Sequence, residues 1–328
     1  MSERPLVSII TANYNGASFL PAAARSVFAQ TLADFEWIIA DDASSDDSLR
    51  VLAHIARGDS RVVVLPAERN GGPATARNRA LAVARGQWIA IFDGDDEMAP
   101  NRLGRMVARG AADGADIVVD NLTLFSQPTQ DGDRPFLSGR AWREPRWISL
   151  ADYIDSGRMY GRRPGLGYLK PLFRADVLGA MRYREDLRIG EDYDLVVRLL
   201  LKRARMRLEP AALYRYRRHG TSISAVLQQG HIEQMIAADR DLNLDSPRRP
   251  VAQRARRAQA RRRRSLEAAL AYDQVIQSLK ARRILTGLAI GLRRPDVWPL
   301  LSMPVTARLK RLAARLGRGR MPPVPAPG

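Results

Sequence analysis

Short apolar segments alternate with segments of helical spacing over residues 6–92 of this 328-residue chain. The apolar segments are rich in β-branched and aromatic residues, which is typical of buried strands. They are Leu6–Ala12, Phe35–Ala40, Arg61–Pro66 and Trp88–Phe92. The stretches between them have the spacing of helices, at residues 19–30, 47–56 and 73–84. This alternation predicts an α/β fold in which helices flank a mixed, mostly parallel sheet.

The most apolar of these strands ends in four residues, Asp93-Gly94-Asp95-Asp96. Three carboxylates so close together repel one another unless a cation neutralises them, and hard oxygen ligands suit Mg²⁺ or Mn²⁺. Ligands of open α/β sheets also bind at the carboxyl ends of the strands. The cluster therefore predicts a divalent metal site. A solvated acidic turn is the alternative for the cluster taken alone.

Three other segments carry polar groups at strand or helix ends. Asp42 follows the second strand, and residues 70–79 place backbone amides and Arg77 at a helix start, where anions are favoured. A tight turn with an exposed arginine is the alternative there. Glu191 and Asp192 begin a helix, where acids either act on a substrate or only complement the helix dipole. No Walker lysine motif and no G-x-G-x-x-G occurs, which disfavours P-loop and dinucleotide folds.

These motifs occur in an order that resembles family 2 glycosyltransferases of the GT-A fold. All lie between Leu6 and Ser224, and they read V-S-I-I-T-A-N-Y-N-G, D-D-A-S-S-D-D-S, N-G-G-P-A-T-A-R-N-R-A-L, F-D-G-D-D and G-E-D-Y-D. Each motif alone is weak, but five in order are specific. The resemblance implies a Rossmann-like GT-A domain that transfers a sugar from a nucleotide diphosphate donor with inversion at the anomeric carbon.

The resemblance also implies a donor site. Tyr14 is expected to stack on the base, and Asp42 to accept the N3–H of uracil. Arg77 adds positive charge near the phosphates, and Asp93 contributes to holding the ribose. Arg215 follows the last strand, where an arginine of some relatives touches the diphosphate. A UDP-sugar is the expected donor, and dTDP or GDP sugars remain open.

Metal and catalytic roles follow from the same resemblance. The divalent metal, Mn²⁺ or Mg²⁺, is assigned chiefly to Asp95 and Asp96, and Asp95 belongs to the donor site as well. His219 is expected to join these ligands, with a solvated loop histidine as the alternative. Asp192 is the expected general base that takes the proton of the acceptor hydroxyl, and Glu191 is expected to orient the acceptor.

The acceptor cannot be read from particular residues. Its specificity is expected to lie in residues 126–145, a predicted surface loop, and in residues 160–170. Similar proteins build bacterial exopolysaccharides such as succinoglycan. The resemblance therefore implies a glycan or lipid-linked acceptor in the assembly of a bacterial surface polysaccharide.

The net charge of +18 is concentrated at the C-terminus. Residues 248–328 hold 20 Lys or Arg and 3 Asp or Glu, whereas the rest of the chain holds 33 and 32. This contrast predicts three parts: a GT-A catalytic domain at 1–225, a basic helical extension at 226–316 and a disordered tail at 317–328. Within the extension, the spacing predicts one or two long helices over 252–292 and a short amphipathic helix over 305–316.

The basic extension is predicted to contact an anionic membrane surface. Packing on the body with a solvated arginine face, or a nucleic-acid arm, are the alternatives. No specific nucleic-acid partner is expected, because no base-reading module accompanies the charge. The chain has no cysteine, no secretory apolar segment and no apolar stretch of ~20 residues. These absences predict a cytoplasmic protein that could lie peripherally on the inner face of the plasma membrane.

Two other function classes remain open from the sequence. A haloacid-dehalogenase-type phosphatase also uses a strand that ends in D-x-D. That family places the motif on an early strand and has Thr or Val two places after the second Asp, where this chain has Glu97. The second class is a non-catalytic polybasic protein that binds membranes or nucleic acid.

Overall fold

The computed structural model describes residues 4–126, 133–220, 227–242, 244 and 249–302. The chain forms two compact units, residues 1–263 and residues 264–328. We call them the sheet unit and the C-terminal unit. The sheet unit extends beyond residue 225, where the sequence suggests that the catalytic domain ends.

Among the described residues, the sheet unit contains a mixed ten-stranded sheet with the order β3-β2-β1-β4-β9-β6-β10-β5; β7 pairs with β6, and β8 with β10. The four longest pairings, β1–β2, β1–β4, β2–β3 and β6–β10, are parallel. The short strand β9 enters the sheet antiparallel between β4 and β6. The strands are β1 (Val7–Asn13), β2 (Phe35–Asp41), β3 (Val62–Pro66), β4 (Trp88–Ile91), β5 (Glu97–Met98), β6 (Ile117–Phe125), β7 (Arg134–Pro135), β8 (Arg146–Ile148), β9 (Leu172–Arg174) and β10 (Met206–Arg217).

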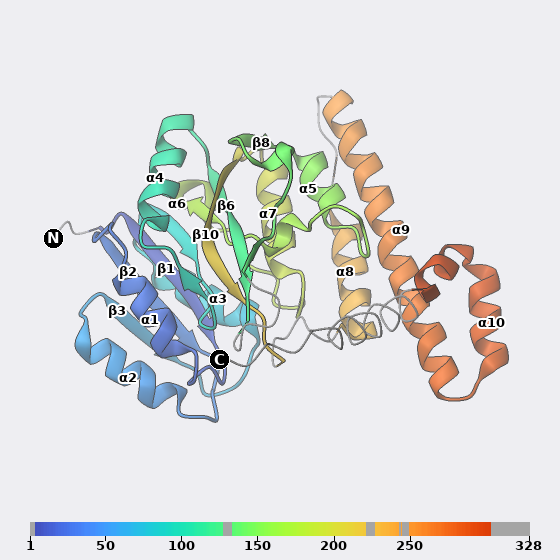
Figure 1. The fold of residues 1–328 in the computed structure, drawn as a ribbon, viewed down its shortest axis with the longest axis horizontal. Helices are drawn as coiled ribbons and strands as arrows, with labels where there is room; N and C mark the ends of the chain where they lie inside the picture. Colours follow the sequence, from blue (N-terminus) through green and yellow to red (C-terminus); the bar gives the residue numbers. More distant parts are fainter. Residues whose placement is uncertain (1–3, 127–132, 221–226, 243, 245–248, 303–328) are drawn as a thin grey trace, which may run out of the picture. The chain divides into compact units, whose positions relative to one another are not determined.

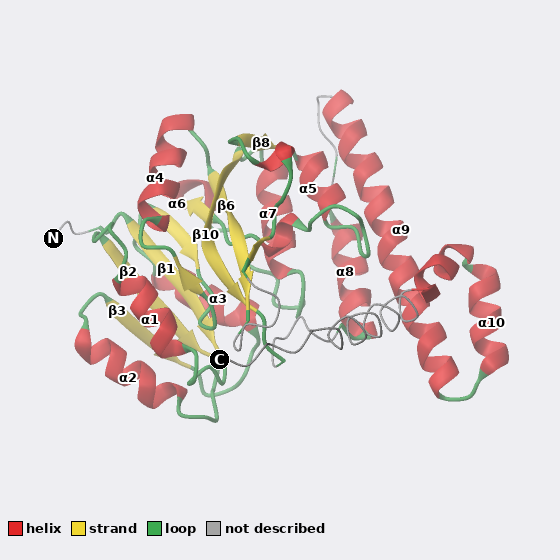
Figure 2. Cartoon of the chain, viewed as in Figure 1, coloured by secondary structure: helices red, strands yellow, loops and turns green. Residues whose placement is uncertain are grey.

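Helices lie against this sheet (Figures 1 and 2). The predicted α/β fold is confirmed, since each of the four predicted N-terminal strands is present and a helix separates each from the next. The helices of the sheet unit are α1 (Leu20–Phe28), α2 (Ser48–Gly58), α3 (Pro73–Val83), α4 (Arg102–Asp113), α5 (Leu150–Ser156), α6 (Ala175–Leu178), α7 (Glu191–Leu201), α8 (Gln229–Asp241) and the first part of α9 (Arg249–Lys280).

An ion pair with no solvent exposure lies in the core of the sheet unit. Arg102 of α4 donates to both carboxylate oxygens of Asp120 on β6, with nitrogen–oxygen distances of 3.0 Å. The same guanidinium donates to the backbone carbonyl of Lys170 at 2.6 Å. Because burying an unpaired charge is costly, this two-pronged contact fixes α4, β6 and the segment before β9 against one another.

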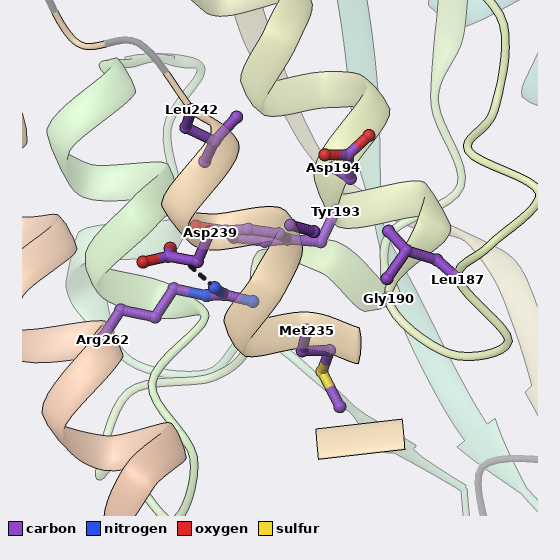
Figure 3. Close-up of a pocket in the computed structure, with 9 residues that line it drawn as sticks. Leu187, Gly190, Tyr193, Asp194, Met235, Asp239, Leu242 and Arg262 are labelled. Carbon is purple, nitrogen blue, oxygen red and sulfur yellow. Dashed lines mark hydrogen bonds and ion pairs between the residues drawn. The ribbon is translucent and has the colours of Figure 1, made fainter. Parts of the chain in front are cut away.

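The middle of α9 contacts α7 and α8 through Arg262, whose side chain lies beside Tyr193 and Asp239 in Figure 3. The guanidinium of Arg262 lies 4.0 Å from the ring centroid of Tyr193 on α7. Its Nη1 atom is 2.8 Å from Oδ1 of Asp239 on α8, which is buried. A small cavity beside this pair is lined in part by Gly190 and Met235. These contacts explain why α8 and the first part of α9 belong to the sheet unit.

The described part of the C-terminal unit consists of the rest of α9, α10 (Ile284–Arg293) and the residues up to 302. Its small core is formed by Ala271, Val275 and Val297. The predicted helix at 305–316 and the predicted tail lie outside the described residues. Within the described residues, no helix combines the length and hydropathy that a membrane span needs.

Candidate active site

A cleft of about 890 Å³ opens in the sheet unit beyond the carboxyl ends of β1 and β4. Its walls come from the residues after these strands, the turn before α3, residues 156–170 and the start of α7. The predicted site residues that line it are Tyr14, Asp42, Arg77, Asp93, Asp95, Glu191, Asp192 and His219. The sheet topology thus brings together side chains from five separate motifs.

The three clustered carboxylates offer oxygen atoms within 4.8 Å of one another, yet each has different partners. Asp93 is paired with two cations: Arg77 Nη2 at 2.8 Å and Lys170 Nζ at 2.7 Å. Burial alone would raise the pKa of the Asp93 carboxyl, but Lys170 and Arg77 outweigh it and hold this pKa well below its usual range. Asp93 is therefore a fixed anion whose charge the protein itself neutralises.

Asp96 is the most buried member of the cluster. Its Oδ2 accepts from the Tyr214 hydroxyl and its Oδ1 from the Arg217 backbone N–H, both at 2.7 Å. Burial, and then the charges of Asp95 and Asp93, raise its pKa well above the ordinary value. Both oxygens of Asp96 are therefore engaged by β10, and these bonds fix the segment after β4 against that strand.

Asp95 is the most accessible member, with 34% of its side chain exposed. One of its oxygens lies 2.8 Å from Nε2 of His219, and the His219 ring packs 4.6 Å from that of Phe19. Both Asp95 and His219 line the cleft. A carboxylate oxygen and an imidazole nitrogen on one wall, beside two further carboxylates, form a donor set that fits Mn²⁺ or Mg²⁺.

The opposite wall carries the two acids at the start of α7. Gly190 precedes them with φ of +93°, a conformation that favours glycine, and this turn directs the first helical residues to the cleft. Arg77 Nη1 is 2.7 Å from Glu191 Oε1. Burial, and then the charge of Asp192, raise the pKa of Glu191 above its ordinary value.

Asp192 is held by one of its oxygens. Its Oδ2 lies 3.4 Å from Nζ of Lys170. Burial alone would lower the pKa of Lys170, but the charges of Asp93 and Asp192 outweigh it and raise this pKa. Its Oδ1 is 3.5 Å from Arg77 and has no hydrogen-bond partner among the described residues. Since buried carboxylate oxygens are usually hydrogen-bonded, an oxygen left over at a cleft wall is suited to accept a proton from a bound molecule.

Another part of the cleft wall contains Tyr14, which is half exposed, and Asp42. The Asp42 oxygens accept from the backbone N–H groups of Gly71 and Gly72 at 2.8 and 2.7 Å. Asp42 therefore shapes the turn before α3 and retains lone pairs for one further donor. Arg77 is buried, which rules out the exposed-arginine alternative; its guanidinium serves Asp93 and Glu191.

Two predicted site residues do not line the cleft: Asp96, whose side chain is held inward, and Arg215. Its nitrogens face Glu97 at 3.6 Å and Asp133 at 3.1 Å, and it covers the ring of Phe125. Arg217 stands closer to the acidic cluster, because its Nε donates to the Asp95 backbone carbonyl at 2.7 Å.

Sequence reasoning missed three residues that hold the site together: Lys170, Tyr214 and Arg217. One signal was available for Lys170, since a lysine is rare in this chain, which has four in total against many arginines. Tyr214 and Arg217 gave no such signal. Their roles depend on the pairing of β10 with β5 and β6.

Comparison with known proteins identifies relatives of this chain. Residues 8–164 match the family model described as Glycosyl transferase family 2. The chain is 38% identical to the succinoglycan biosynthesis protein ExoO of Rhizobium meliloti (strain 1021) over 319 residues, which cover 95% of this chain and 88% of ExoO.

Two solved structures share the fold. S. aureus TarS 1-349 in complex with UDP-GlcNAc matches with a TM-score of 0.60 and 18% identity, over 88% of this chain and 92% of that one. The mannosyltransferase PcManGT from Pyrobaculum calidifontis, in complex with GDP-Man and Mn²⁺, matches with a TM-score of 0.56 and 16% identity, over 90% and 83%. These similarities confirm the predicted fold.

Proposed function

The chain belongs to glycosyl transferase family 2, and we propose that it inverts the anomeric carbon of a nucleotide-diphosphate sugar as it transfers that sugar to an acceptor hydroxyl. The observation that carries this proposal is how the two carboxylate oxygens of Asp192 are contacted. One of its oxygens is held near Lys170, and the other is buried at the cleft wall without a hydrogen-bond partner among the described residues. A carboxylate oxygen with spare acceptor capacity beside the cleft, steadied by Arg77 at 3.5 Å, suits the role of general base.

In the proposed step, the acceptor hydroxyl oxygen attacks the anomeric carbon from the side of Asp192. The bond from that carbon to the diphosphate oxygen breaks, and its electron pair leaves with the diphosphate. The hydroxyl proton passes to Oδ1 of Asp192. Lys170 and Arg77 hold the base in place, while Glu191 stands beside it to orient the acceptor.

Asp95 and His219 are the residues best placed to hold a divalent metal, with Asp93 and Asp96 behind them. When bound there, such a metal would neutralise charge on the departing diphosphate. Tyr14 and Asp42 are proposed to receive the base of the nucleotide. PcManGT, which shares the fold, was solved with GDP-Man and Mn²⁺, and TarS with UDP-GlcNAc.

We assign the biological role by the same reasoning. The 38% identity to ExoO supports a place in the synthesis of a succinoglycan-like exopolysaccharide, with a glycan or lipid-linked acceptor. A UDP-sugar is the proposed donor. Family membership argues against the phosphatase and non-catalytic alternatives.

Asp192→Asn tests the catalytic half of the proposal. We expect transfer to fall by about 10²–10⁴-fold, since an amide cannot act as the base, while donor affinity stays within a factor of three or so. Donor turnover and calorimetric binding are measured side by side. Asp194→Asn is the matched control, because Asp194 lies on the same helix but pairs with Arg198 outside the cleft. Retained turnover in Asp192→Asn would contradict the assignment.

A thermal-shift screen tests the donor half. Nucleotide sugars are added with Mn²⁺ or Mg²⁺, and at least one is expected to raise the unfolding temperature in a metal-dependent way. Asp95→Ala should abolish this shift, whereas Asp176→Ala, which changes an exposed aspartate paired with Arg174, should leave it intact. If no nucleotide sugar stabilises the wild type, the proposed donor class is wrong.

A further inference from the structure

Helix α10 packs with two glycines and the partly buried Ile290, and it exposes its other large apolar residues. Gly287 and Gly291 are buried, and a Cβ atom at Gly291 would lie 2.9 Å from the Trp298 ring. Leu285 and Leu292, in contrast, are 83% and 77% exposed. Ile284 and Leu288 are exposed as well. An ordinary amphipathic helix buries its leucines, so α10 presents an apolar face that the described residues of its unit leave exposed.

The four exposed side chains form one stripe. Positions 284, 285, 288 and 292 fall on a single face of an α-helix, because residues three to four apart are neighbours there. We call this stripe the α10 face. The small core of the unit, formed by Ala271, Val275 and Val297, contacts α10 through Ile290, which is not part of the stripe. The face is therefore a continuous surface rather than scattered exposed residues.

Positive charge frames the α10 face. Lys280, Arg282 and Arg283 precede the helix, Arg293 ends it, and all four are exposed. No Asp or Glu occurs between Asp273 and Asp296. Asp296 is itself paired with Arg294 at 2.8 Å. The charges bordering the exposed leucines are thus of one sign.

We propose that the α10 face binds the surface of a membrane that contains anionic lipids. Its apolar side chains enter the boundary between headgroups and acyl chains, and the framing lysine and arginines meet the lipid phosphates. An anionic membrane surface offers an apolar boundary for the exposed leucines and phosphates for the basic residues. A second copy of the chain would bring like charges together, and a nucleic acid would leave the leucines in water. The inference is independent of the proposed transfer reaction.

Flotation of the full-length protein with vesicles tests this inference. We expect binding to vesicles rich in phosphatidylglycerol and at least tenfold weaker binding to pure phosphatidylcholine. The apolar variant L285Q/L292Q and the basic variant R282Q/R283Q should each weaken binding to phosphatidylglycerol vesicles at least tenfold. Both changes lie on exposed positions, so circular dichroism and the unfolding temperature should match the wild type.

Two matched controls come from the sheet unit. L49Q/V83Q removes two exposed apolar side chains, and R25Q/R57Q removes two exposed charges. Both should bind vesicles as the wild type does. The inference is overturned if the wild type does not float, or if L285Q/L292Q floats as well as the wild type. It is also overturned if light scattering shows a dimer that this variant abolishes while vesicle binding is unchanged.

Discussion

The two units of the chain place charge and apolar surface in opposite ways. The sheet unit buries charged side chains and pairs them: Arg102 with Asp120, Arg77 with Asp93 and Glu191, and Arg262 with Asp239. The C-terminal unit exposes leucines and surrounds them with basic residues. A buried charge is tolerated only where a partner fixes it, so charges inside the sheet unit are precisely positioned. The exposed leucines of α10 have no such partner among the residues that the structure describes and are open to another surface.

This difference separates two uses of arginine in an arginine-rich chain. In the sheet unit, Arg77 and Arg102 act as internal counter-ions that set the geometry of the cleft. In the C-terminal unit, Arg282 and Arg283 are exposed and act as surface charge. Net charge alone cannot distinguish the two uses, since every arginine adds one positive charge whatever its environment.

The largest expected effect comes from breaking the core ion pair. Arg102→Met leaves Asp120 buried without its partner and also removes the hydrogen bond to the Lys170 carbonyl. We expect a loss of about 3–5 kcal/mol in the free energy of unfolding, measured by urea denaturation. Adding Asp120→Leu should restore most of it, because the uncompensated charge is then gone.

Arg50→Met is the control for this prediction. It breaks an exposed pair with Asp47, and the urea midpoint should not move. If Arg102→Met had the same urea midpoint as the wild type, the buried ion pair would not contribute to the stability of the sheet unit.

The next effect is kinetic. Lys170→Met removes the cation that lies between Asp93 and Asp192. Because the proposed base then loses its support, we expect kcat for transfer to fall by about 10²-fold with a smaller change in donor affinity. Lys170→Arg should recover part of the activity, which a loss of folding would not allow. Lys202→Met, at the exposed end of α7, is the control; a similar loss there would remove the positioning role.

The sequence predicted well whatever depends on local pattern. Period and turn residues located the first four strands. Asp95 and Asp192, which belong to two of the motifs, and His219, which the resemblance added, all line one cleft, and their roles there stay predictions. Sequence reasoning failed where a contact joins distant residues. Whether Arg215 or Arg217 reaches the acidic cluster depends on the local course of β10, where the pairing with β6 is irregular.

The compact sheet unit extends to residue 263, past the predicted domain end at residue 225, for a related reason. Arg262 lies within a run of basic residues that looks uniformly solvated, and only the fold reveals that it stacks on Tyr193 and pairs with Asp239. Neighbouring arginines of one run therefore have different environments. Charge counting averages over them and cannot detect the one that is buried.

The smallest expected effect is the sharpest test of the contrast between the units. Leu285→Ala should change the free energy of unfolding by no more than about 0.5 kcal/mol, because this side chain buries little surface in its own unit. Leu52→Ala makes the same substitution at a fully buried position on α2 and should cost about 2–5 kcal/mol. Urea denaturation of both variants measures the difference. If Leu285→Ala were as destabilising as Leu52→Ala, the α10 face would be part of a folded core, and a lipid surface would not be needed to cover it.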